Sequence, residues 1–198
     1  LRTPLTAICG YLDLLEQEES GDNVKKYLDV IRERTDTMRS LTEELFSCSL
    51  LAIQDEKLHI EQICINDILE QSIAGFYGVL INKRILPDIQ MSEIRVMKQL
   101  DKEAVRRIFD NILSNAARYS DGDLAISLSA DGRIQFSNHA AKLSSVEVEK
   151  LFEHFYTVES ARNSTGIGLS IARLLTERMG GDITAEYKDG QLYIQIAF

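Results

Sequence analysis

The sequence predicts an α+β chain in which a helical hairpin precedes a two-layer α/β sandwich. Apolar residues in the first fifty positions recur every three or four residues, which is the period of packed helices. After Ala52, short apolar runs alternate with helical patterns. Asp131-Gly132 and Asp189-Gly190 each join two alternating segments, as β-hairpin turns do. We therefore expect a boundary near residue 56, giving regions 1–56 and 57–198.

Composition and charge exclude several classes of protein. Hydrophobic residues make up 44% of the 198 positions and charged residues 27%, as in ordinary soluble domains. The net charge of −9 argues against a nucleic-acid binder, which needs clustered Lys and Arg. Cys9, Cys48 and Cys64 form neither a disulfide framework nor a zinc-binding pair, which fits a reducing cytosol.

The first region reads as two antiparallel helices. Its first seam has spacings of 4, 3, 4 and 3 residues, through Leu1, Leu5, Ile8, Leu12 and Leu15. A polar turn over 16–23 follows, and a second seam runs from 24 to 52. Two helices alone cannot bury such a wide stripe, so dimerisation into a four-helix bundle is one solution. Packing on the rest of the same chain is the alternative.

The second region reads as mixed strands and helices. Asn66 and Asp101 stand where helix N-caps are expected, and Gly180-Gly181 where a helix ends. We expect a single sheet with its helices on one face. In order, the predicted elements are strand 62–65, helix 66–82, strands 84–87 and 95–98, helix 101–118, hairpin 124–129/134–137, a helix from Ser144 or Ser145 to 154, helix 168–179 and hairpin 183–187/192–197.

Asn111, Asn115 and Arg118 form the first candidate site. Their spacings of four and three place them on one helix face. Amide oxygens can bind Mg²⁺, and a guanidinium can bind phosphate oxygens. Two asparagines on a helix are equally compatible with a merely solvated surface.

A glycine-containing turn is the second candidate. Gly166 and Gly168 stand just before a predicted helix, where backbone N–H groups can approach a phosphate. An ordinary turn explains the pattern too. Residues 152–163 run from an aromatic cluster into a polar segment, the composition of a mobile lid, or of a helix end and a surface loop.

In order and spacing, these motifs resemble those of the sensor histidine kinases of two-component systems. Residues 1–6, Leu-Arg-Thr-Pro-Leu-Thr, are similar to the downstream part of the H box, and 111–120 to the N box. Residues 152–156 resemble the F box and 165–169 the G2 box. The resemblance covers the whole chain. It implies a dimerisation and histidine-phosphotransfer hairpin over 1–56 and a catalytic ATP-binding domain of the gyrase and Hsp90 type over 57–198.

The resemblance also implies roles for single residues. Asn115, with Asn111 alongside, would hold the Mg²⁺ that bridges the ATP phosphates. Thr3 would help to dephosphorylate the partner regulator. The remaining cofactor-binding positions would be Arg118 at phosphate, Tyr119 near the nucleoside, Asn138 at adenine, Phe155 in the F box, Arg162 on the lid, and Thr165, Gly166, Gly168 and Leu169 around the phosphates.

Two positions depart from the family pattern. The phosphoacceptor histidine would fall just upstream of Leu1, so the chain as printed lacks it. We interpret His59, His139 and His154 as incidental. At the G1 box, Asn138 replaces the usual Asp and no glycine follows over 139–143. A neutral acceptor is roughly half as strong as a charged one.

The resemblance therefore implies a protein-histidine kinase that uses ATP and Mg²⁺, works as a homodimer, and passes phosphate to a response regulator receiver domain. Phosphatase activity toward that regulator is compatible with this reading. The chain would be the cytoplasmic part of a bacterial sensor, reaching the membrane only through an upstream segment. A non-catalytic, ATP-sensing dimeric scaffold is the alternative, because the G1 segment is altered.

Overall fold

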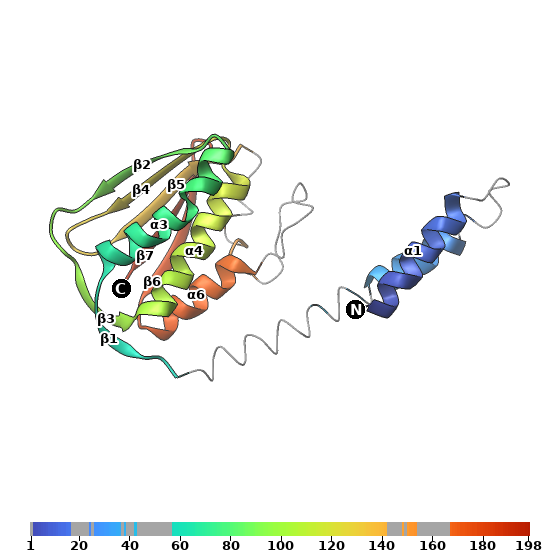
Figure 1. Cartoon of the computed structure of the whole chain (residues 1–198), viewed down its shortest axis with the longest axis horizontal. Coiled ribbons are helices and arrows are strands. Elements are labelled where there is room, and N and C mark those ends of the chain that lie inside the picture. Colours follow the sequence, from blue (N-terminus) through green and yellow to red (C-terminus); the bar gives the residue numbers. More distant parts are fainter. Residues whose placement is uncertain are drawn as a thin grey trace. The chain divides into compact units, whose positions relative to one another are not determined.

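The chain divides into two compact units, Leu1–Glu56 and Lys57–Phe198. The structure is a computed structural model that describes residues 2–16, 24, 26–36, 38, 42, 57–141, 148, 150–153 and 167–198 (Figure 1). Among these residues, no helix is both long enough and apolar enough to cross a membrane.

The first unit contains helix α1, Arg2–Glu16, and a second helical stretch over 26–36. The two contact each other through Tyr11 and Tyr27, whose ring centroids lie 5.8 Å apart. Leu12 and Leu28, both on the predicted seams, remain 46% and 51% exposed. The helical hairpin is thus present, and it leaves apolar seam positions open to solvent.

The second unit is built on a five-stranded mixed sheet of order β2-β4-β5-β7-β6. β2 pairs parallel with β4, and the other neighbours pair antiparallel. Pro87 lies in β2 at the edge of the sheet, where a missing N–H is tolerated. The strands are β2 Leu86–Met91, β4 Asp123–Leu128, β5 Ile134–His139, β6 Asp182–Lys188 and β7 Gln191–Ala197.

The prediction of a single sheet was wrong. β1, Ile60–Cys64, and β3, Met97–Asp101, pair with each other as a separate antiparallel ribbon. Each leads directly into a helix, β1 into α3, Ile65–Asn82, and β3 into α4, Lys102–Tyr119. The ribbon therefore joins the beginnings of two helices.

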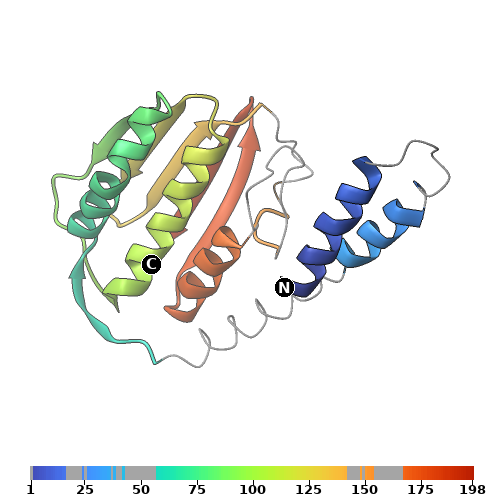
Figure 2. The same cartoon turned by 45° about the vertical axis from the view of Figure 1, so that its right-hand side comes forward.

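The helices α3, α4 and α6, Gly168–Arg178, cover one face of the sheet (Figure 2). Alternate residues of β4, β5 and β7 are buried, as expected when only one face of a sheet is covered. Phe109 of α4 meets Phe136 of β5 across the two layers, with ring centroids 6.1 Å apart. The predicted two-layer architecture is confirmed.

Local signals placed most helix ends correctly. Asp101 caps α4 by accepting the Ala104 N–H at 2.9 Å. Asn66 is not an N-cap: it lies inside α3, and its Oδ1 accepts the Val96 N–H at 2.9 Å. α6 ends before Gly180, whose φ is +78°. Both Asp-Gly hairpins are present, whereas the helix predicted between 144 and 154 lies largely outside the described residues.

Candidate nucleotide-binding site

Asn111, Asn115 and Arg118 lie along α4, on the side that its core residues leave free. α4 buries Ile108, Ile112 and Ala116. Asn111 and Asn115 each precede one of these residues, so they lie at the border of the buried stripe. Asn111 and Asn115 are partly exposed and Arg118 is exposed. Within the described part of the chain, neither the Asn115 side chain nor the Arg118 guanidinium forms a hydrogen bond or ion pair. The amide of Asn115 and the cation of Arg118 are therefore available to a ligand.

The N-terminus of α6 lies beside Asn111. A Cβ built on Gly168 would stand 3.4 Å from the Asn111 Oδ1, so the first turn of α6 contacts this side chain directly. No side chain of the described residues caps α6, and its first turn has no acidic residue. Free N–H groups and the helix dipole favour an anion at such an end. Leu169 of the same turn is buried and anchors it.

Asn111 carries a buried, unsatisfied donor. Its Nδ2 is shielded from solvent and has no hydrogen-bond partner among the residues that the structure describes. A buried donor without an acceptor costs about 1–3 kcal/mol. A phosphate oxygen near the start of α6 would remove this cost, which fits a polyanionic ligand between α4 and α6.

Asn138, the residue predicted to contact the base, lies next to the last residue of β5. On β5 it continues the buried row of Ile134 and Phe136, and it is only 6% exposed. Its Nδ2 donates to the carbonyl oxygen of His139 at 2.9 Å. Its Oδ1 accepts no hydrogen bond from the described residues. An acceptor in an otherwise buried side chain is thus left over.

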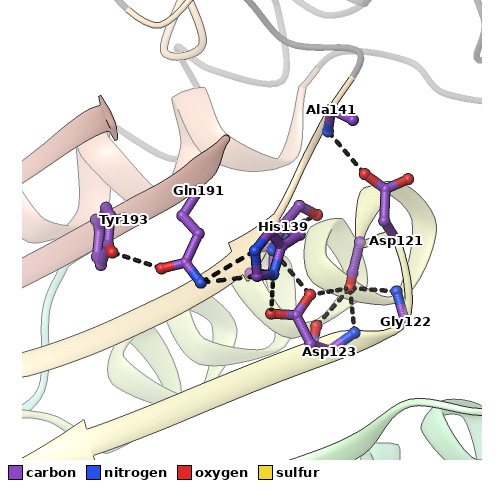
Figure 3. A network of polar contacts seen from close by, with 9 residues as sticks. Asp121, Gly122, Asp123, His139, Ala141, Gln191 and Tyr193 are labelled. Carbon is purple, nitrogen blue, oxygen red and sulfur yellow. Dashed lines mark hydrogen bonds and ion pairs between the residues drawn. The ribbon is translucent and has the colours of Figure 1, made fainter. Parts of the chain in front are cut away.

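The short loop after α4 holds the end of β5 through Asp121 and Asp123 (Figure 3). Ser120 is the C-cap of α4, and the next residue, Asp121, accepts the Ala141 N–H at 2.7 Å. Asp123 accepts the His139 N–H at 2.8 Å and contacts the His139 ring Nδ1 at 2.8 Å. The end of β5 is therefore fixed beside the end of α4 that carries Arg118.

The charge of Asp123 is stabilised inside this network. Burial opposes its ionisation, but the hydrogen bonds from the ring and backbone of His139 outweigh burial and hold the pKa of Asp123 below the usual value. The side chains of Asp123 and His139 are 43% and 55% exposed. The contact between these two side chains is therefore worth little, as is usual near the surface.

Several predicted site residues lie outside the described part. These are Phe155, Arg162, Thr165 and Gly166. Thr3 belongs to α1, but its side chain is not described. Phe152 of the aromatic cluster is buried, and the guanidinium of Arg173 in α6 stands 5.6 Å from its ring centroid. This aromatic anchor therefore packs against the helix that follows the glycine turn.

The sequence reasoning missed Asp121, Asp123 and the contacts of His139. We read His139 as incidental, yet it pairs with Asp123 across the open end of the β4–β5 hairpin. Counting back from the Asp131-Gly132 turn would have placed 123 opposite 139. That register was the available signal.

The residues present fit a nucleotide with bound magnesium. The unpaired Asn111 donor, the Arg118 cation and the uncapped α6 suit phosphate groups. Among the described residues, no group of three or more His, Cys, Asp or Glu could bind a metal by itself. A cation would rely on amide oxygens together with phosphate oxygens, which is typical of Mg²⁺.

Comparison with known proteins agrees with this geometry. Residues 100–196 match the model of the histidine kinase-, DNA gyrase B- and HSP90-like ATPases. Residues 1–51 match that of the His Kinase A (phospho-acceptor) domain. The sensor histidine kinase YcbM of Bacillus subtilis is 30% identical over 199 residues, covering 95% of this chain and 64% of YcbM. The chain belongs to the sensor histidine kinases of two-component systems.

Solved structures share the fold. Histidine kinase ThkA, in complex with the response regulator protein TrrA, gives a TM-score of 0.64 at 19% identity, covering 98% of this chain and 57% of that one. Full-length ShkA, in complex with AMPPNP, gives 0.62 at 24% identity, covering 98% and 43%. The chain thus spans less than two thirds of YcbM and of both these structures.

Proposed function

We propose that this chain is the kinase core of a sensor histidine kinase that binds ATP with Mg²⁺ through its second unit. The observation that carries the proposal is the row Asn111, Asn115 and Arg118 beside the uncapped start of α6. Bound ATP would supply the γ-phosphoryl group. Residues 57–198 are then the catalytic ATP-binding domain, and residues 1–56 the dimerisation and histidine-phosphotransfer hairpin.

Each side chain has a defined task in this proposal. Asn115 offers an amide oxygen to Mg²⁺, with Asn111 next to it. Arg118 neutralises phosphate charge, and the first turn of α6 at Gly168 and Leu169 donates N–H groups to phosphate oxygens. Tyr119 at the end of α4 borders the nucleoside, and Asn138 accepts from the base. Phosphoryl transfer is mainly positioning and charge stabilisation, and these residues provide both.

Further roles follow from the family. Phe155, Arg162, Thr165 and Gly166 are proposed to close over the nucleotide. The phosphoryl group would pass to an imidazole nitrogen of a histidine that precedes Leu1 in the full-length protein, releasing ADP, and then to an aspartate of a response regulator. The protein would act as a homodimer on the cytoplasmic side of a membrane. Thr3 would serve the reverse reaction, dephosphorylation of the regulator.

A second candidate is a dimeric scaffold that does not catalyse transfer. It is favoured by the segment after Asn138, which lacks glycine and whose Ala140 is buried. Such a scaffold would either sense ATP without transferring its phosphoryl group or bind no nucleotide. A scaffold that binds no nucleotide differs from the kinase in whether the chain binds ATP in the presence of magnesium.

Calorimetric titration of the chain with ATP, with and without Mg²⁺, tests the proposal. We expect magnesium-dependent binding at micromolar to low-millimolar affinity. Asn115→Ala should weaken ATP binding in magnesium at least about tenfold, because hydrogen bonds and contacts to charged groups contribute about 1.5–3 kcal/mol.

Asn82→Ala, which removes an exposed asparagine at the end of α3, is the matched control and should bind as the wild type does. Wild-type affinity in Asn115→Ala would contradict the metal assignment. No ATP binding by the wild type would favour the scaffold.

A further inference from the structure

The last residues of β5 and those just after it are held by the loop that follows α4. Asp121 donates its N–H to the His139 carbonyl at 3.0 Å and accepts the Ala141 N–H at 2.7 Å. Asp123 accepts the His139 N–H at 2.8 Å. Ser120 Oγ in turn accepts the N–H groups of Gly122 and Asp123, each at 3.0 Å. Two carboxylates and one backbone N–H of this loop thus fix the path of 139–141.

The turn between β6 and β7 holds the same segment from its other side. Ala140 donates its N–H to the Gly190 carbonyl at 3.0 Å and accepts from the Tyr187 hydroxyl at 3.2 Å. The side chain of Gln191 lies 3.4 Å from the His139 ring, and Tyr193 donates to Gln191. Each backbone N–H from 139 to 141 therefore has an acceptor, although none of these three residues is a glycine.

We call these hydrogen bonds, which hold residues 139–141 between Asp121, Asp123 and the turn at Gly190, the latch. The carbonyl of His139 links the latch to Asn138. It accepts both the Asp121 N–H and the Asn138 Nδ2. An amide can be turned by 180°, exchanging its donor and acceptor. The turned amide would place the Asn138 Oδ1 against the His139 carbonyl oxygen, and two acceptors repel each other. The latch therefore favours the orientation in which Asn138 keeps Oδ1 as its unpaired acceptor.

We propose that Asp121 and Asp123 are positioning residues that act through His139 to fix the Asn138 amide with its Oδ1 toward the nucleotide base. The proposal rests on the nucleotide site described above. A fixed Oδ1 accepts from the amino group of adenine and opposes the carbonyl that guanine has at the same place. The latch thereby gives a neutral Asn the selectivity of a carboxylate acceptor.

The backbone hydrogen bonds carry most of this effect. The contact between the His139 ring and the Asp123 carboxylate is about half exposed and contributes little. The bonds from Asp121 to His139 and Ala141 determine where the shared carbonyl lies. Removing the Asp121 carboxylate frees the Ala141 N–H, so this substitution disturbs the latch without touching the base directly.

The experiment compares the affinities of the whole chain for ATP and for GTP, in magnesium, by calorimetry. Asp121→Ala should lower the ATP-to-GTP affinity ratio about five- to tenfold, as expected for one misplaced hydrogen bond. Asp121→Asn should keep the ratio, because its Oδ1 can still accept the Ala141 N–H. Asp131→Ala, in the turn at the far end of the same hairpin, is the control and should also keep it.

Two further variants make the result independent of folding defects. Asp123→Ala should shift the ratio in the same direction and replaces Asp121→Ala if circular dichroism shows that variant unfolded. In an Asn138→Ala background, Asp121→Ala should change the ratio no further, because the two residues act on one contact.

The outcomes separate the two proposals. If the wild type binds no ATP, the result contradicts the proposed nucleotide site and, with it, the proposed role of the latch. A wild type that binds ATP, with an unchanged ratio in both alanine variants, overturns the latch alone. Equal weakening of ATP and GTP also overturns it, since it indicates a purely structural role.

Discussion

Asp101 shows how one side chain sets the start of the helix that carries the site. Its Oδ1 accepts the Ala104 N–H at 2.9 Å, and its Oδ2 accepts the His59 N–H at 2.7 Å. Burial opposes its charge, but these backbone donors prevail and hold the pKa of Asp101 below the ordinary carboxyl value. The cap thus joins α4 to the residue just before β1.

Replacing Asp101 should destabilise the second unit in a pH-dependent way. Because the folded pKa is lowered, the carboxylate stabilises the fold above the ordinary Asp pKa, and this contribution is lost as the pH falls through the folded value. Asp101→Ala should cost about 1 kcal/mol at pH 7, and its difference from wild type should shrink in acid. Urea unfolding at several pH values measures this.

Asp101→Asn keeps a capping oxygen and serves as the control for the loss of charge alone. A pH-independent cost of Asp101→Ala would contradict the assignment.

Among the elements, the junction between α6 and β6 lies tightly against the end of β7. Gly181 follows α6, and a Cβ there would lie 2.6 Å from the Ala197 carbonyl oxygen. Backbone cannot yield as a flexible side chain can. In contrast, Gly78 stands on the exposed side of α3 with nothing within 4 Å of a Cβ position. The same substitution should therefore have opposite effects at these two positions.

Gly181→Ala should lower the free energy of unfolding by about 1–3 kcal/mol, the usual cost of overpacking. Gly78→Ala should raise it by about 0.5–1 kcal/mol, because alanine loses less backbone entropy in a helix. Denaturant titration of both variants checks the pair, with Gly78→Ala as the internal control. A stabilising Gly181→Ala would show that the end of β7 moves freely.

For the whole molecule, the exposed apolar seam of the first unit is the feature that favours dimerisation. Leu12 and Leu28 are about half exposed although the heptad pattern assigns them to a buried seam. Two helices present more apolar surface than they cover in each other. A second copy of the hairpin would bury it, as the homodimer hypothesis requires.

Leu28→Glu should therefore convert the dimer to a monomer, because it places a charge inside an apolar seam. Sedimentation equilibrium measures the mass, and circular dichroism checks that helices persist. Arg32→Glu, an exposed position off the seam, introduces the same side chain and should remain dimeric. Dimers of unchanged stability in Leu28→Glu would place the interface elsewhere.

Local signals determined much of this protein. The Asp101 cap, the glycine end of α6 and both Asp-Gly hairpins depend on residues within a few positions of one another, so the sequence alone predicts them. The spacing of Asn111, Asn115 and Arg118 follows from helix geometry in the same way. The heptad seams predict the helical hairpin.

Only the tertiary structure decided which distant segments meet. It pairs β1 with β3 rather than adding them to the main sheet, and it places β2 parallel to β4. It turns Asn66 from an expected cap into a partner of Val96, thirty residues away. It also brings Asp121 to Ala141 and the start of α6 to Asn111. These contacts depend on how the layers pack, and the energy that selects them is shared by residues too far apart in the sequence to form a local pattern.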